Sequence, residues 1–141
     1  MGRQLMTTYI GIDPGVKTGF AVSVNGKLLS VESMRIDQAM AKILWLNMSN
    51  FKIKVFIEDA RLRKWFGANS NAKQQGAGSI KRDCGIWEDF LQDKGIDFVF
   101  IAPKDQKGLT KVKQARFINM TGWTKQTNEH SRDAAMLVWG R

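Results

Sequence analysis

Short, largely apolar runs bounded by turn residues occupy the first part of the chain, and they predict strands. These runs cover residues 8–13, 20–24 and 27–35. Asn25-Gly26, between the second run and the third, is a strong signal for a two-residue hairpin turn. Because a tight hairpin joins strands that run in opposite directions, we expect an antiparallel meander here.

Further along the chain, apolar residues at helical spacing alternate with short apolar runs. We expect helices and strands in turn, and parallel pairing for the strands that are reached across a helix. The expected elements are a helix at 37–48 with Asp37 as its N-cap, a strand at 53–57, a helix at 72–94, a strand at 97–102, a short helix within 104–120 and a helix at 129–139. The pattern predicts an α/β fold with a five-stranded mixed sheet, three antiparallel strands and then two parallel ones, flanked by helices.

Composition narrows the class of protein. The length of 141 residues fits one domain, 1–141, at about 100–200 residues per domain. Lys and Arg number 22 against 13 Asp and Glu, and the net charge of +9 indicates a polyanionic partner, most often nucleic acid. We expect a cytoplasmic protein, because neither a secretory signal nor a membrane span is present in the sequence. A single cysteine, Cys84, excludes internal disulfides and a cysteine-based zinc site.

The few acidic residues fall where their side chains could converge. Asp13 ends the first predicted strand before a Pro-Gly turn, and Glu58 ends the fourth. Asp133 follows His130 by three positions, so both lie on one face of the last helix. Three carboxylates and an imidazole could hold two divalent ions, Mg²⁺ or Mn²⁺, for phosphodiester hydrolysis. The alternative is a structural role for each residue: Asp13 would be a turn residue, Glu58 a solvated strand end, and His130 and Asp133 would cap the helix. Glu129 could also replace His130 if the helix were rotated.

Two stretches combine cations with residues suited to nucleic acid. In the first, cations lead into two aromatic residues; cations position phosphates, and aromatic rings can stack on bases. In the second, five cations accompany one acid, and Lys104, Lys107 and Lys111 are expected on one helical face. A solvated loop and a solvated helix face are the alternatives. The candidates for DNA contact are Arg61, Arg63, Lys64, Trp65, Phe66, Lys104, Lys107, Lys111, Lys113 and Arg116.

Four segments resemble the RuvC-type Holliday junction resolvases, in the order found in that family and over nearly the whole chain. They are IGIDPGVKTGF at 10–20, FIEDARL at 56–62, QQGAGSIK at 74–81 and HSRDAAML at 130–137. The resemblance implies an RNase H-like fold and a homodimer acting on branched DNA. It also implies paired, metal-dependent nicks in a four-way junction, which leave 5′-phosphate and 3′-hydroxyl ends.

The same resemblance assigns roles to individual residues. Asp13, Glu58 and Asp133 match the family's metal-binding carboxylates, which implies two Mg²⁺ or Mn²⁺ ions per active site. His130 matches a position that is Asp in some members and His in others, and its role as ligand or general base stays open. The short C-terminus is typical of the compact versions that phages and other small genomes encode.

The chain departs from the family after the second acid. Members often carry an aromatic residue there that probes the centre of the junction, whereas this chain has Arg61. Whether Trp65 or Phe66 takes that role is open, and Lys104, Lys107 and Lys111 are candidates for the family's catalytic lysines.

Two alternative functions are a nuclease that acts on other branched DNA or on RNA, and a non-catalytic protein that binds junctions. An actin-like ATPase would need two such domains, so we expect no nucleotide cofactor.

Overall fold

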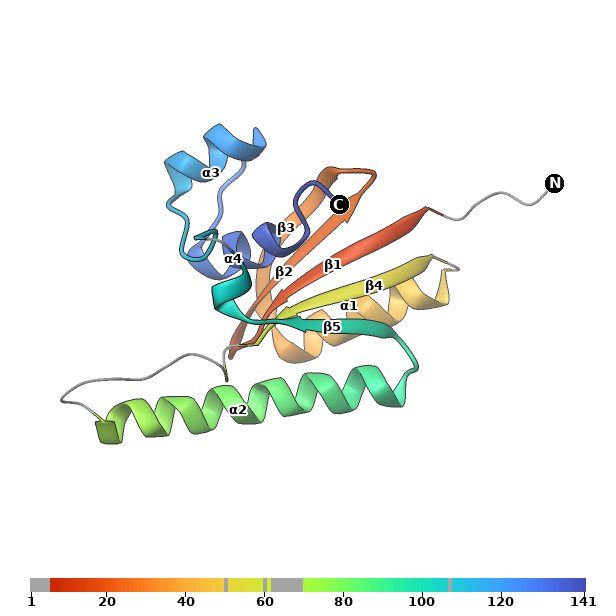
Figure 1. Ribbon diagram of the computed structural model, residues 1–141. Helices are drawn as coiled ribbons and strands as arrows, with labels where there is room; N and C mark the ends of the chain where they lie inside the picture. The colour runs from red at the N-terminus through yellow and green to blue at the C-terminus, as the bar shows by residue number, and fades with distance from the viewer. Residues whose placement is uncertain (1–5, 50, 60, 62–69, 107) are drawn as a thin grey trace.

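A five-stranded mixed sheet forms the centre of the computed structural model, which describes residues 6–49, 51–59, 61, 70–106 and 108–141, with 70–77 as backbone only (Figure 1). The strand order is β3-β2-β1-β4-β5. Its first three strands are antiparallel, while β4 pairs with β1 and β5 pairs with β4 in parallel. The strands are β1 (Thr7–Asp13), β2 (Lys17–Val24), β3 (Lys27–Arg35), β4 (Lys52–Glu58) and β5 (Asp97–Ile101). The predicted fold class is confirmed, although β2 begins three residues earlier than the hydrophobic run indicates.

The turn between β2 and β3 is the one that the sequence predicts. Asn25 and Gly26 both have positive φ, 54° and 80°. Two successive residues with positive φ make a type I′ turn, whose twist matches that of the flanking strands.

Helices cover both faces of the sheet (Figure 1). On one face lie α1 (Ile36–Met48) and α2 (Ser70–Asp93). The other face carries α4 (Glu129–Val138), against which α3 (Gln114–Thr121) packs. None of the helices in the described part of the chain is long and apolar enough to cross a membrane.

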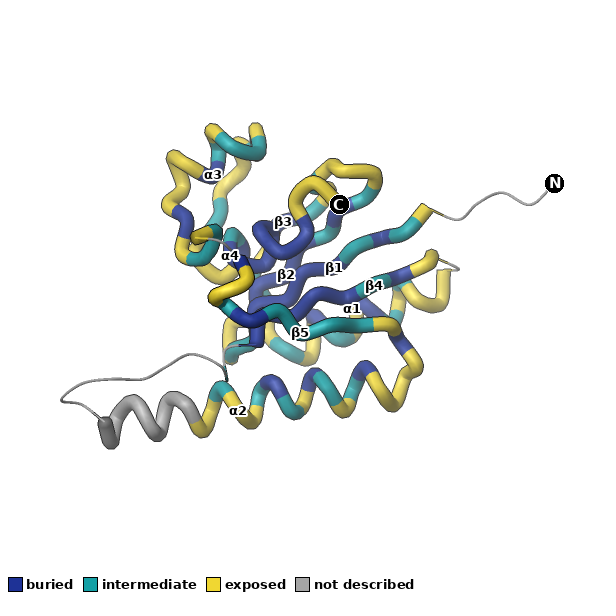
Figure 2. The backbone as a smooth tube through the Cα atoms, in the orientation of Figure 1, coloured by how far each residue is buried: buried dark blue, intermediate teal, exposed yellow. Residues whose placement is uncertain are grey.

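Each face of the sheet has its own hydrophobic core. On the first face, Trp87 and Leu91 of α2 join Ile43 of α1 against the isoleucines of β1 and β4. Cys84 of α2 is also buried, as expected of a small core residue. On the second face, the core is built around α4, which is buried from Asp133 to Val138 over β1 and β2 (Figure 2). Strand alternation therefore decides which β1 and β4 side chains face α4.

The predicted N-cap of α1 is wrong. The cap position is Arg35, because β3 runs directly into the helix and the first helical residue is Ile36. Asp37 lies in the first turn, where its carboxylate accepts hydrogen bonds of 3.1 Å from the Arg35 guanidinium. This ion pair lowers the pKa of the Asp37 carboxyl.

The helical face predicted for the lysines after β5 is also wrong. Residues Pro103–Gln106 form a short 3₁₀ helix, η2, and α3 begins only at Gln114. Between them Gly108 and Lys111 have positive φ, 78° and 54°, which no α-helix tolerates. Lys104 and Lys111 therefore do not share a helix, and Lys107 lies outside the described residues.

Candidate metal centre

Three acidic side chains meet where β1 and β4 end and α4 passes over them. One carboxylate oxygen each of Asp13, Glu58 and Asp133 lies within 4.8 Å of the other two. All three residues are buried, with exposed fractions of 7%, 0% and 4%. The structure thus brings together the three carboxylates that the sequence singles out.

Strand register explains why the first two carboxylates meet. β1 and β4 are parallel neighbours, with Ile12 opposite Ile57. Both isoleucines belong to the core under α1 and α2. The next residue in each strand, Asp13 or Glu58, must therefore point to the opposite face, towards α4.

Two glycines allow α4 to come close enough to add the third. A Cβ at Gly19 would overlap the carbonyl oxygen of His130, and a Cβ at Gly11 would overlap that of Ala134. The helix backbone thus lies directly on the backbone of β1 and β2. Sequence reasoning missed both residues, although a glycine inside a strand is a known signal of close backbone approach.

His130 contacts the cluster through Asp13. Its Nδ1 lies 3.0 Å from Oδ2 of Asp13, and its side chain is about half exposed. An ionised carboxylate only accepts hydrogen bonds, so Nδ1 donates to Asp13, which in the neutral imidazole leaves the lone pair on Nε2. Both residues that the sequence leaves open, Glu129 and His130, are exposed, and His130 makes this contact with Asp13.

The rotation of α4 is fixed by its first turn. The Asn128 side chain accepts a hydrogen bond of 2.9 Å from the backbone N–H of Ser131, and Asn128 N–H donates to Ser131 Oγ. This reciprocal capping anchors the start of the helix. It therefore helps to set which side chains of α4 face Asp13.

Asp133 is also held by the loop that precedes α3. The backbone N–H of Lys111 donates a hydrogen bond of 2.7 Å to Oδ1 of Asp133. Lys111 adopts a φ of 54°, a left-handed conformation that is strained for a lysine. The loop thus contributes a backbone donor that the sequence did not point to, and an exposed lysine close to the carboxylates.

The donor set fits a hard divalent cation. Carboxylate oxygens are the ligands that Mg²⁺ and Mn²⁺ prefer. Three carboxylates at this separation repel one another unless a positive charge lies between them. The cluster could therefore bind metal.

Sequence comparison gives neither a matching family model nor a similar curated protein. Among solved structures, T. thermophilus RuvC in complex with Holliday junction substrate is similar, with a TM-score of 0.61 and 18% sequence identity. The match covers 92% of this chain and 89% of that chain. The chain has the RuvC fold. This confirms the RNase H-like architecture that the sequence motifs imply.

Arg61, which stands shortly after the second acid, is engaged in contacts within the fold itself. Arg61 donates to both carboxylate oxygens of Asp59, at 2.8 and 3.0 Å, which raises the pKa of the guanidinium. The guanidinium also lies 4.6 Å from the ring centroid of Phe100 and 3.6 Å from the carboxylate of Glu88. Asp59 thus turns away from the cluster, as strand alternation predicts.

The other candidates for DNA contact divide into two groups. Lys104, Lys111, Lys113 and Arg116 are exposed. Arg63, Lys64, Trp65, Phe66 and Lys107 lie outside the described residues. Contact of any of these with DNA stays a prediction.

Proposed function

We propose that this chain is a structure-selective endodeoxyribonuclease that resolves four-way DNA junctions by paired, metal-dependent nicks. Each nick leaves a 5′-phosphate and a 3′-hydroxyl end. The observation that carries the proposal is the buried cluster of Asp13, Glu58 and Asp133, within 4.8 Å of one another in a RuvC fold. A similar solved structure, described as RuvC with Holliday junction substrate, supports the substrate class.

Asp13, Glu58 and Asp133 would hold two Mg²⁺ or Mn²⁺ ions, with His130 at the edge of the site. Such ions supply activation of the attacking water and stabilisation of the leaving 3′ oxygen. The protein contributes carboxylates fixed by two strand ends and one helix, so little reorganisation is needed when the substrate arrives.

His130 and the cationic residues near the carboxylates would assist the reaction. With Nδ1 donating to Asp13, the Nε2 lone pair of His130 can accept a proton or bind a cation. Lys111 orients Asp133 through its backbone and offers its ammonium group to the charge that develops on the scissile phosphate. Lys104, Lys113 and Arg116 add exposed cations for the DNA backbone.

Two nicks at symmetry-related positions need two active sites, and the described residues of one chain contain one such carboxylate cluster. The protein would therefore act as a homodimer. Ile86 of α2 is 42% exposed and is a candidate for the two-fold interface. Sedimentation velocity should give a dimer for the wild type and more monomer for Ile86→Glu. A monomer at all concentrations that support paired nicking would contradict the dimer.

The test of the function is a comparison of substrates under one salt condition. Labelled four-way junctions, flaps, plain duplexes and RNA–DNA hybrids are incubated with the wild type, Asp13→Asn and the control Asp97→Asn. Asp97 is exposed at the start of β5, the end of that strand away from Glu58, so its variant should behave as the wild type. The wild type should nick the four-way junction in pairs and give products that DNA ligase reseals, while Asp13→Asn binds without nicking.

The other outcomes identify the competing functions. Equal cleavage of flaps or hybrids would indicate a broader RNase H-like nuclease. Binding without cleavage in either metal would indicate a non-catalytic junction-binding protein. Either result would overturn the proposal.

A further inference from the structure

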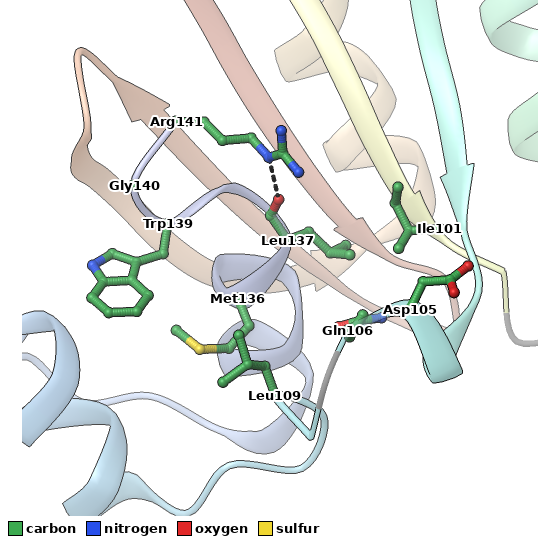
Figure 3. Close-up of a pocket in the computed structure, with 9 residues that line it drawn as sticks. All are labelled: Ile101, Asp105, Gln106, Leu109, Met136, Leu137, Trp139, Gly140 and Arg141. Carbon is green, nitrogen blue, oxygen red and sulfur yellow. Dashed lines mark hydrogen bonds between the residues drawn. The ribbon is translucent and has the colours of Figure 1, made fainter.

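A pocket of about 250 Å³ lies between α4 and the segment that follows β5 (Figure 3). Ile101, Leu109, Met136 and Trp139 contribute its apolar and aromatic lining. Asp105, Gln106 and Arg141 also line it. Apolar walls with a few polar groups are typical of sites that bind a small organic group.

Gln106 is the unusual residue of this pocket. It is only 7% exposed, and neither its amide nitrogen nor its amide oxygen has a hydrogen-bond partner among the described residues. Its backbone is fixed at the end of η2, where its carbonyl oxygen accepts a hydrogen bond of 3.0 Å from the N–H of Leu109. A buried amide without partners costs stability, so this one is expected to meet a ligand that offers both an acceptor and a donor.

The pocket adjoins the carboxylate cluster. Ile101 stands opposite Glu58 in the parallel register of β4 and β5. Trp139 follows Asp133 by six residues, about 9 Å along a helix axis. Leu109 is two residues before Lys111, whose N–H binds Asp133. A DNA strand held at the carboxylates would therefore pass within reach of the pocket.

We propose that this pocket receives one unstacked nucleobase, adenine in preference to others, from the strand beside the nicked phosphate. A single base fits the volume, and apolar side chains can cover its two faces. A glutamine amide can pair with N6 and N7 of adenine at once. The two unpartnered amide atoms of Gln106 match this pattern, and because both are closed off from solvent, the side chain must turn into the pocket to meet the base. Arg141, whose Nε donates to the Leu137 carbonyl (Figure 3, dashed line), adds a cation beside the pocket. This inference rests on the proposed junction cleavage.

The experiment scans the junction with single abasic residues near the nicking site. At one position, removal of the base should lower the nicking rate of the wild type by about tenfold. This is the range expected for the loss of one base contact made through two hydrogen bonds. With adenine at that position, 7-deazaadenine, which lacks the N7 acceptor, should also slow nicking. A junction that carries the fluorescent base 2-aminopurine at that position can be bound by the wild type in the absence of metal, so that no nicking occurs. Binding should then change the fluorescence of the 2-aminopurine.

The Gln106→Leu variant distinguishes a role of Gln106 in base binding from a purely structural role. It removes the unpartnered amide, so it should unfold at a higher temperature than the wild type. It should nick the intact junction more slowly than the wild type and show no further loss with the 7-deaza substrate. Its loss with the abasic substrate should be smaller than that of the wild type, because only the contacts of the apolar walls remain to be lost. Gln92→Leu, an exposed position on α2, is the matched control and should keep the wild-type response.

The outcomes are distinguishable. A wild type that nicks the junction but is indifferent to every abasic position overturns the base pocket alone. Equal abasic sensitivity in Gln106→Leu and the wild type also overturns it. A protein that neither binds nor nicks the junction overturns both this inference and the proposed function.

Discussion

Gly19 of β2 lies directly against the backbone carbonyl of His130 in α4, so closely that a Cβ at position 19 would overlap the oxygen. Gly11 of β1 has the same relationship to Ala134. Together the two glycines set how near α4 lies to the sheet. This spacing brings Asp133 into the cluster and lets His130 bind Asp13.

Gly19→Ala should therefore damage stability and activity together. The added methyl group must displace backbone, so we expect a loss of at least about 3 kcal/mol, the upper part of the usual range for overpacking. Junction nicking should fall because Asp133 moves away from Asp13. Urea unfolding and a nicking assay on the same preparation measure the two effects.

Gly78→Ala is the matched control. This glycine lies in α2, and among the described residues a Cβ there would meet no atom within 4 Å. Alanine should increase the free energy of unfolding by about 0.5–1 kcal/mol and leave nicking unchanged. A Gly19→Ala protein as stable as Gly78→Ala would contradict the close contact.

Two substitutions of Lys111 distinguish the effect of its backbone strain from the effect of its side-chain charge. Its φ of 54° suits glycine, so Lys111→Gly should gain about 1 kcal/mol of stability while keeping the N–H that binds Asp133. Lys111→Ala should lose the same cation without that gain. Both variants should nick more slowly than the wild type, and to a similar extent. Equal stability of the two variants in urea would show that position 111 is not strained.

Divalent metal should raise the melting temperature of the wild type. Binding to the folded state alone adds about 2.7 kcal/mol at a concentration one hundred times the dissociation constant. Glu58→Gln should lose most of this effect, whereas Glu32→Gln, an exposed residue of β3, should keep it. Thermal unfolding with and without Mg²⁺ or Mn²⁺ gives the comparison. An undiminished shift in Glu58→Gln would place the metal elsewhere.

Features of the fold with local causes could be predicted from the sequence. Asn25-Gly26 specifies its turn by backbone preference alone, and the hydrophobic runs locate all five strands. The convergence of Asp13 and Glu58 follows from parallel pairing once both acids are placed at strand ends. The RuvC-type motifs added the fold family, which the charge excess alone does not indicate.

The remaining features depend on tertiary contacts that a linear pattern does not contain. The lysines after β5 have helical spacing, but Gly108 and Lys111 take positive φ and break the expected helix. The importance of Gly19 depends on a helix more than a hundred residues away in sequence. Gln106 carries no sequence signal, because only its burial, without a hydrogen-bond partner in the described part of the chain, sets it apart.

The most direct test of the central claim is junction nicking by Asp133→Asn in Mg²⁺ or Mn²⁺. Asparagine keeps the shape of the side chain and an oxygen that can accept the Lys111 N–H, while the charge available to a cation is removed. We predict junction binding and thermal stability close to those of the wild type, with nicking reduced by at least about a hundredfold. Nicking at the wild-type rate by this variant would contradict the proposed metal centre.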